Sequence, residues 1–136
     1  MLLDVEGAMS ESKLPRPTDA ELAILRVLWA RGPSTVREVH EALQDGSGYT
    51  TVLKMMQIMT EKGLVVRDEA QRAHVYSSRV TQQKTQRQLV TDLVERAFGG
   101  SPAQLAMQAL STKKTSPEEL AELRRLLDSL EQEVEP

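Results

Sequence analysis

The chain has 136 residues, which suits one domain or one small domain with an appendage. Apolar residues make up 40% of it and charged residues 27%, as in ordinary globular proteins, but aromatic residues reach only 3%. We therefore expect an aliphatic core and a mainly helical fold. The absence of cysteine excludes disulfides and thiolate metal or redox sites.

The net charge of −3 argues at first sight against a nucleic-acid partner. Residues 14–80 nevertheless carry nine Lys or Arg against eight Asp or Glu, and all of the acidic excess lies outside them. Any affinity for phosphate must come from local placement of cations, so we expect it to be moderate and sensitive to salt.

The N-terminal segment, residues 1–13, is acidic and has neither helical periodicity nor a continuous apolar core. It is not typical of a signal peptide, and no apolar run approaches the length of a membrane span. We expect a flexible tail on a cytoplasmic protein without membrane insertion. Met9 is a second candidate for the start of translation.

Two capping boxes predict the first two helices. Thr18 with Glu21 starts a helix that ends near Arg31, before the break at Gly32-Pro33, and Thr35 with Glu38 starts the next. The residues expected to face the core are Leu22, Leu25, Leu28 and Trp29 in the first helix, and Val36, Val39 and Leu43 in the second.

A third helix is predicted over Tyr49–Lys62, closed by Gly63. One side of the helical wheel is apolar and carries Val52, Met55, Met56 and Met59, at the spacing of a stripe packed on a core. The opposite side is polar and carries Thr50, Lys54, Gln57 and Glu61.

Two short strands are expected after this helix, at residues 64–67 and 73–76, joined by a charged tip at residues 68–72. A helix with an exposed polar face that leads into such a ribbon is typical of a winged helix-turn-helix. The sequence thus predicts a mainly α fold with a small β-hairpin wing, in which residues 14–79 form a DNA-binding domain.

Residues 80–136 change in character and predict three more helices, which begin at Thr81, Ser101-Pro102 and Ser116-Pro117. In the last of these, leucines recur at spacings of three and four from Leu120 to Leu130, as in a heptad seam. Such faces either fold back on the first domain or pair with a second chain. We favour a homodimer, because residues 18–79 have enough helix faces to close their own core. The apolar residues assigned to this dimerisation region are Leu89, Leu93, Phe98, Leu105, Leu110, Leu120, Leu123, Leu127 and Leu130.

Taken together, these segments resemble the penicillinase-repressor (BlaI/MecI) family of winged-helix transcriptional repressors. The matching stretches are TDAELAILRVLW at 18–29, TTVLKMMQIMTEKGLV at 50–65, HVYSS at 74–78, LVTDLVERAFGGS at 89–101 and SPEELAELRRLLDSL at 116–130. The resemblance runs from about residue 14 to residue 130. It implies a homodimer joined through its C-terminal helices on a dyad operator of double-stranded DNA, with each third helix in a major groove.

Chemistry then assigns roles along the third helix and the wing. Thr50 and Thr51 reach phosphates or base edges from the first turn, where the helix N-terminus favours an anion. Lys54 suits guanine and Gln57 suits adenine. Flanking phosphates are assigned to Arg67, Arg72 and His74. The alternative for each of these residues is that its side chain is exposed to solvent and has no role in binding.

The chain departs from the family at Leu53 and Ile58, where polar or basic residues are expected, so the operator sequence does not transfer. In antibiotic-responsive members, a membrane sensor-protease pathway leads to cleavage of the repressor in its dimerisation region. The aligned bond here is Gln108–Ala109, which lacks the Asn–Phe junction associated with cleaved members. Plain dimer packing of this stretch is the alternative.

We expect neither a metal nor another cofactor. Copper-responsive relatives use C-terminal cysteines, which are missing here, and His40 and His74 have no partner at ligand spacing. An enzyme is disfavoured because there is no Gly-rich phosphate loop and no histidine near a nucleophile or a paired acid. Two other functions stay open, a winged-helix module that binds protein and a ligand-sensing repressor with an effector pocket.

Overall fold

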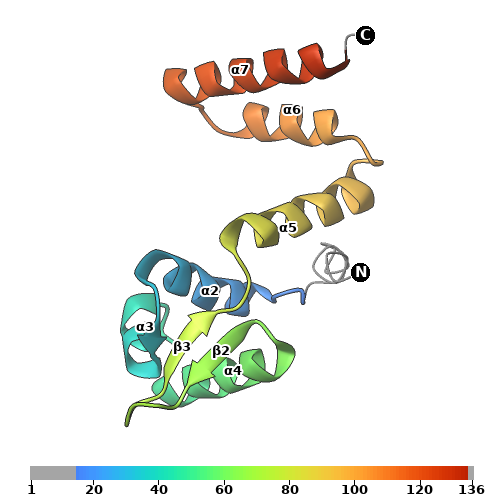
Figure 1. Ribbon diagram of the computed structural model, residues 1–136. Helices are drawn as coiled ribbons and strands as arrows, with labels where there is room; N and C mark the ends of the chain where they lie inside the picture. The colour runs from blue at the N-terminus through green and yellow to red at the C-terminus, as the bar shows by residue number, and fades with distance from the viewer. Residues whose placement is uncertain (1–14, 135–136) are drawn as a thin grey trace. The chain divides into compact units, whose positions relative to one another are not determined.

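The computed structural model describes residues 15–134, so the predicted tail at residues 1–13 lies outside the described part. The elements in chain order are α2 (Asp19–Arg31), β1 (Ser34–Thr35), α3 (Val36–Leu43), α4 (Tyr49–Lys62), β2 (Val65–Asp68), β3 (Val75–Ser78), α5 (Gln82–Ala97), α6 (Pro102–Thr112) and α7 (Pro117–Val134) (Figure 1). The chain forms two compact units that divide between Thr91 and Asp92.

Both predicted capping boxes are present. The Thr18 hydroxyl accepts the N–H of Glu21 at 3.2 Å, and the Glu21 carboxylate accepts the N–H of Thr18 at 2.9 Å. Thr35 and Glu38 repeat the arrangement at 3.2 and 2.9 Å. Each box satisfies two N–H groups that have no partner within the helix, which fixes where α2 and α3 begin.

A three-stranded antiparallel sheet covers one side of these helices, with strand order β1-β3-β2. The strand β3 pairs with β2, with Arg67 opposite Tyr76, and with β1, with Ser34 opposite Tyr76. Three helices are followed by a β-hairpin, which is the order of a winged helix-turn-helix. In this unit, α3 and α4 form the helix-turn-helix. We call β2, β3 and the loop at residues 69–74 the wing.

Two features of the sheet differ from the prediction. The strands lie at Val65–Asp68 and Val75–Ser78, one and two residues later than expected, so the exposed loop is longer. The strand β1 was not predicted at all, because two polar residues after Gly32-Pro33 carry no strand signal of their own. Their partners Val75 and Tyr76 are about 40 residues further along the chain.

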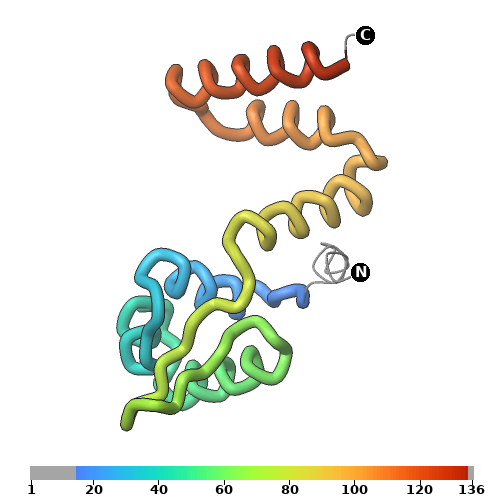
Figure 2. The backbone as a smooth tube through the Cα atoms, viewed as in Figure 1, coloured from blue at the N-terminus to red at the C-terminus, as the bar shows by residue number. Residues whose placement is uncertain are grey.

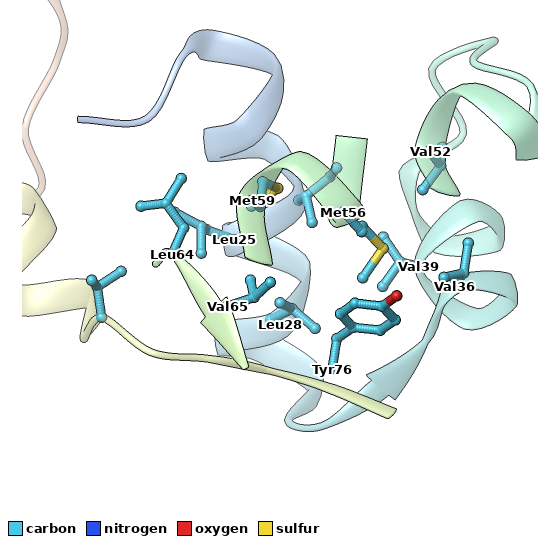
Figure 3. Close-up of a cluster of buried hydrophobic side chains, with 12 residues drawn as sticks. Leu25, Leu28, Val36, Val39, Val52, Met56, Met59, Leu64, Val65 and Tyr76 are labelled. Carbon is cyan, nitrogen blue, oxygen red and sulfur yellow. The ribbon is translucent and has the colours of Figure 1, made fainter. Parts of the chain in front are cut away.

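The core of the first unit is aliphatic, as predicted, and includes one fully buried aromatic residue, Tyr76. Figure 3 shows the helices and the hairpin contributing to one cluster. Ile24 is completely buried, whereas Leu22, expected there, is only half-buried. Two residues apart on an α-helix are about 200° apart around its axis. The buried stripe of α2 runs through Ile24, Leu25 and Leu28, which leaves Leu22 at its edge. Trp29 is also only half-buried and packs against the edge of this cluster, where its indole N–H donates to the Ser78 hydroxyl and the Val80 carbonyl, both at 3.0 Å.

The second unit contains α6 and α7, which lie side by side (Figure 2). Ser101 caps α6 by accepting the N–H of Gln104 at 3.2 Å, and Ser116 accepts the N–H of Glu119 at 3.1 Å ahead of α7. The predicted start signals of both helices are therefore confirmed. No helix within residues 15–134 is long and apolar enough to cross a membrane.

Candidate nucleic-acid interface

The exposed side of α4 carries the four polar residues assigned to DNA. Thr50, Thr51, Lys54 and Gln57 are all exposed. The other side is anchored by Val52, Met56 and Met59, each completely buried. Since the buried stripe fixes the rotation of α4 about its axis, the polar residues project from the unit as one continuous face.

The start of α4 favours an anion. Its N-cap is Gly48, which provides no side-chain hydrogen bond, and the first turn contains no acidic residue. The first-turn N–H groups therefore keep their partial positive charge, which suits a phosphate. At the other end of α4, Gly63 adopts a φ of 84° and closes the helix, as the sequence predicted.

The three wing residues assigned to phosphates differ in their surroundings. Arg72 and His74 are exposed in the loop. Arg67 is half-buried, and its guanidinium donates to the Glu69 carboxylate from Nε at 2.8 Å and from Nη2 at 2.5 Å. Hydrogen bonds to Tyr76 and to Glu69 raise the pKa of Arg67. Its charge is thus already balanced within the wing by Glu69.

A groove of about 370 Å³ lies between the start of α3, the start of α4 and the wing. Arg72 and His74 line it from the wing, and Arg37 and Tyr49 line it from the helices. The remaining lining residues are Thr35, Val36, Leu53, Ala73 and Tyr76. The fold thus brings Arg72 and His74 of the wing next to the first turn of α4.

Sequence reasoning missed Arg37 and Tyr49 as site residues. Both are exposed, and Tyr49 keeps 47% of its surface accessible. They lie in the first turns of α3 and α4, so the helix-turn-helix prediction itself offered a signal, because the first turns of its two helices approach the same backbone. Leu53, a departure from the family, lines the groove and packs on the core, and Ile58 is 40% exposed.

The residues assigned to the dimer contact expose apolar surface on the single chain. Those with the largest exposure are Leu93, Leu127 and Leu130, at 50%, 58% and 46%. Leu89 and Leu110 are also exposed, while Phe98, Leu105, Leu120 and Leu123 are half-buried. Exposed leucines repeated along one helix indicate a surface that another molecule covers.

The aligned cleavage bond lies inside a helix. Gln108 and Ala109 are exposed but lie within α6, and the Gln108 carbonyl accepts a hydrogen bond from the Thr112 hydroxyl at 2.6 Å. Among residues 15–134, no cluster of three or more His, Asp or Glu side chains is arranged to hold a metal ion.

Comparison with known proteins places these features in a family. The penicillinase repressor family matches residues 17–129. The transcriptional regulator BlaI of Mycobacterium tuberculosis is 34% identical over 123 residues, which cover 88% of this chain and 88% of that protein. The penicillinase repressor of Bacillus licheniformis is 24% identical over 118 residues, with 85% and 92% covered. The solution structure of the DNA binding domain of the repressor BlaI superposes with a TM-score of 0.48 and 24% identity, covering 53% of this chain and 90% of that domain.

Proposed function

Since the chain belongs to the penicillinase repressor family of transcriptional repressors, we propose that it binds a dyad operator as a homodimer, through α4 and the wing. The observation that carries the proposal is the continuous polar face of α4 beside the cation-lined groove. A helix of 14 residues is about 21 Å long, enough to lie across a major groove with its exposed side against the bases.

Within this interface, Lys54 and Gln57 face the base edges, and Thr50 and Thr51 contact the DNA from the first turn of α4. The hydroxyls and the N–H groups of that turn suit phosphate as well as base edges. All four side chains are exposed and need no rearrangement of the core to reach DNA.

The sugar–phosphate backbone is proposed to follow the groove between α3, α4 and the wing. Arg37, Arg72 and His74 bring cationic groups or hydrogen-bond donors to its walls, and Tyr49 adds a hydroxyl. Arg67 contributes less, because a phosphate has to compete with Glu69 for its guanidinium. Few phosphates are neutralised in this arrangement, which agrees with a chain of net charge −3 and predicts moderate affinity at physiological salt.

The homodimer is proposed to form through the exposed apolar residues of α5, α6 and α7. Leu127 and Leu130 lie on the seam of α7, and more than two-fifths of the surface of each is exposed in the single chain. Covering such surface in a two-fold contact removes it from water and places two copies of α4 on one duplex.

Relief of repression is proposed to use cleavage between Gln108 and Ala109, started by a membrane sensor-protease pathway. The cut separates α7 and its leucine seam from the winged helix. Because the bond is helical and the Thr112 hydroxyl binds the Gln108 carbonyl, α6 has to unwind locally before a protease can act. Mass spectrometry of the protein from cells treated with a penicillin should find a fragment ending at Gln108. Induction that leaves the chain intact contradicts this step.

The proposed interface is tested by Lys54→Ala, with Lys113→Ala as the matched control that removes the same charge from an exposed site between α6 and α7. The probe is the duplex that the wild-type protein selects from a randomised library. Lys54→Ala should weaken binding about fivefold or more and lower the slope of log K against log salt, by about one if its charge is lost from the DNA contact. Lys113→Ala should bind as the wild type does. If both variants bind the duplex as tightly as the wild type does, α4 is not part of the DNA interface.

A further inference from the structure

The turn between α3 and α4 decides where α4 begins, and it is held in an unusual way. Side chains cap α2, α3 and α6, at Thr18, Thr35 and Ser101, but the N-cap of α4 is a glycine without a side-chain cap. The turn also contains Gln44 and Gly46 at positive φ, 49° and 87°. A short turn of this composition does not fix the start of the next helix by backbone preference alone.

Two side chains hold the Ser47 residue of this turn instead. The Ser47 N–H donates to the Asp45 carboxylate at 2.9 Å. The Ser47 carbonyl lies 3.0 Å from Nε2 of His40, a residue of α3. A carbonyl oxygen can only accept, so Nε2 of His40 carries the proton and donates it. Ser47 directly precedes Gly48, the N-cap of α4, and is thus tied on one side to α3.

The same imidazole also meets the first residue of α4. The rings of His40 and Tyr49 are 6.0 Å apart between centroids and 84° apart between planes, an edge-to-face contact. His40 therefore contacts the chain on both sides of the Gly48 N-cap, through a hydrogen bond before it and a ring contact after it. Among residues 15–134, no other side-chain hydrogen bond links α3 to this turn.

We infer that His40 is a positioning residue for DNA recognition. By holding the Ser47 carbonyl, it fixes the start of α4 and so the placement of Tyr49, Thr50 and Thr51, which follow within four residues. The inference rests on the proposed DNA binding, since it assigns His40 a role in that function without contact to DNA. The first backbone hydrogen bond of α4, from the Val52 N–H to the Gly48 carbonyl at 3.1 Å, reports directly on this start.

Two substitutions separate the hydrogen bond from the ring contact. His40→Phe keeps an aromatic ring beside Tyr49 but has no donor for the Ser47 carbonyl. His40→Gln loses the ring and keeps an amide N–H at a similar reach to Nε2. Each variant is measured as the full chain, by fluorescence anisotropy with the duplex selected by the wild type and with a scrambled duplex, and by amide hydrogen exchange of Val52 with Met59 as the internal reference.

His40→Phe should bind the selected duplex about fivefold more weakly, the loss expected for one hydrogen bond, while its binding to the scrambled duplex stays the same. Exchange of the Val52 amide should accelerate several-fold without a change at Met59, which lies two turns further along α4. His40→Gln should retain most of the wild-type affinity and of the protection of Val52.

Three results overturn the inference. The first is wild-type affinity and Val52 protection in His40→Phe. The second is an equal loss in His40→Gln, because the hydrogen bond is then not responsible. The third is a parallel loss for both duplexes together with faster exchange at Met59, which indicates a general loss of stability. If the wild type selects no duplex, the proposed function fails, but the exchange of Val52 still decides whether His40 fixes the start of α4.

Discussion

Glu21→Ala removes a side chain that joins the start of α2 to the end of α4. The carboxylate is buried, with 6% of the residue surface exposed, and accepts the Thr18 N–H at 2.9 Å and the Lys62 ammonium at 2.7 Å. A neutral hydrogen bond contributes about 1 kcal/mol and one to a charged group about 1.5–3 kcal/mol. Because the Lys62 side chain is 36% exposed and regains water, we expect a net loss of about 2–3 kcal/mol in the free energy of unfolding.

The contact between Glu21 and Lys62 should also make the free energy of unfolding depend on pH. Burial by itself raises the pKa of Glu21, but the hydrogen bonds from Lys62 and Thr18 and the charge of Lys62 outweigh it and lower the pKa below its ordinary 4.5. A carboxyl with a lowered pKa stabilises the fold above the ordinary value, and this contribution is lost as pH falls through the folded-state pKa. The difference in stability between the wild type and Glu21→Gln should therefore be present at pH 7 and shrink below about pH 4.5.

Urea unfolding followed by circular dichroism at several pH values measures both effects. The matched control is Glu38→Ala, which removes the corresponding capping carboxylate of α3 at a more exposed position, paired with Arg31 at 3.6 Å. The loss in Glu38→Ala should be clearly smaller than in Glu21→Ala. Equal losses in the two variants, or a difference for Glu21→Gln that does not change between pH 7 and pH 3, would refute the reasoning.

Two more predictions concern the end of α4 and the dimer contact. Gly63→Ala should lower the free energy of unfolding by about 1 kcal/mol in urea, because φ is 84° and a Cβ there meets no atom within 4 Å, so only the backbone conformation is penalised. An unchanged urea midpoint contradicts it. Leu127→Asp should convert the proposed dimer to monomers in analytical ultracentrifugation, whereas Ser129→Asp, with the same charge added away from the leucine seam, should stay dimeric. Dimers in both variants would place the contact elsewhere.

Much of the fold could be predicted because its signals are local. The range Tyr49–Lys62 could be predicted to the residue, because a glycine lies directly before it, at Gly48, and directly after it, at Gly63. The starts of α2 and α3 followed from Thr18 and Thr35, whose hydroxyls bond to groups only three residues away. Such contacts depend on sequence spacing and very little on the rest of the chain.

The parts that escaped prediction depend on contacts between distant segments. The pairing of Ser34 with Tyr76 joins residues 42 positions apart, and no local pattern around either residue predicts its partner. The same holds for the groove, because Arg37 and Tyr49 line it together with His74 only when the wing lies against the helices. The ion pair of Arg67 with Glu69 is local, but its consequence, a cation already balanced, follows only from the side-chain geometry.

Sequence-specific binding by a homodimer is tested most directly by selection of duplexes from a randomised library with the wild-type protein at low salt. The account predicts an inverted repeat with half-sites about one helical turn apart, two chains bound per duplex, and an affinity that falls steeply as salt increases. A library that shows no enrichment at low salt, or a selected duplex that binds one chain without two-fold symmetry, would contradict it.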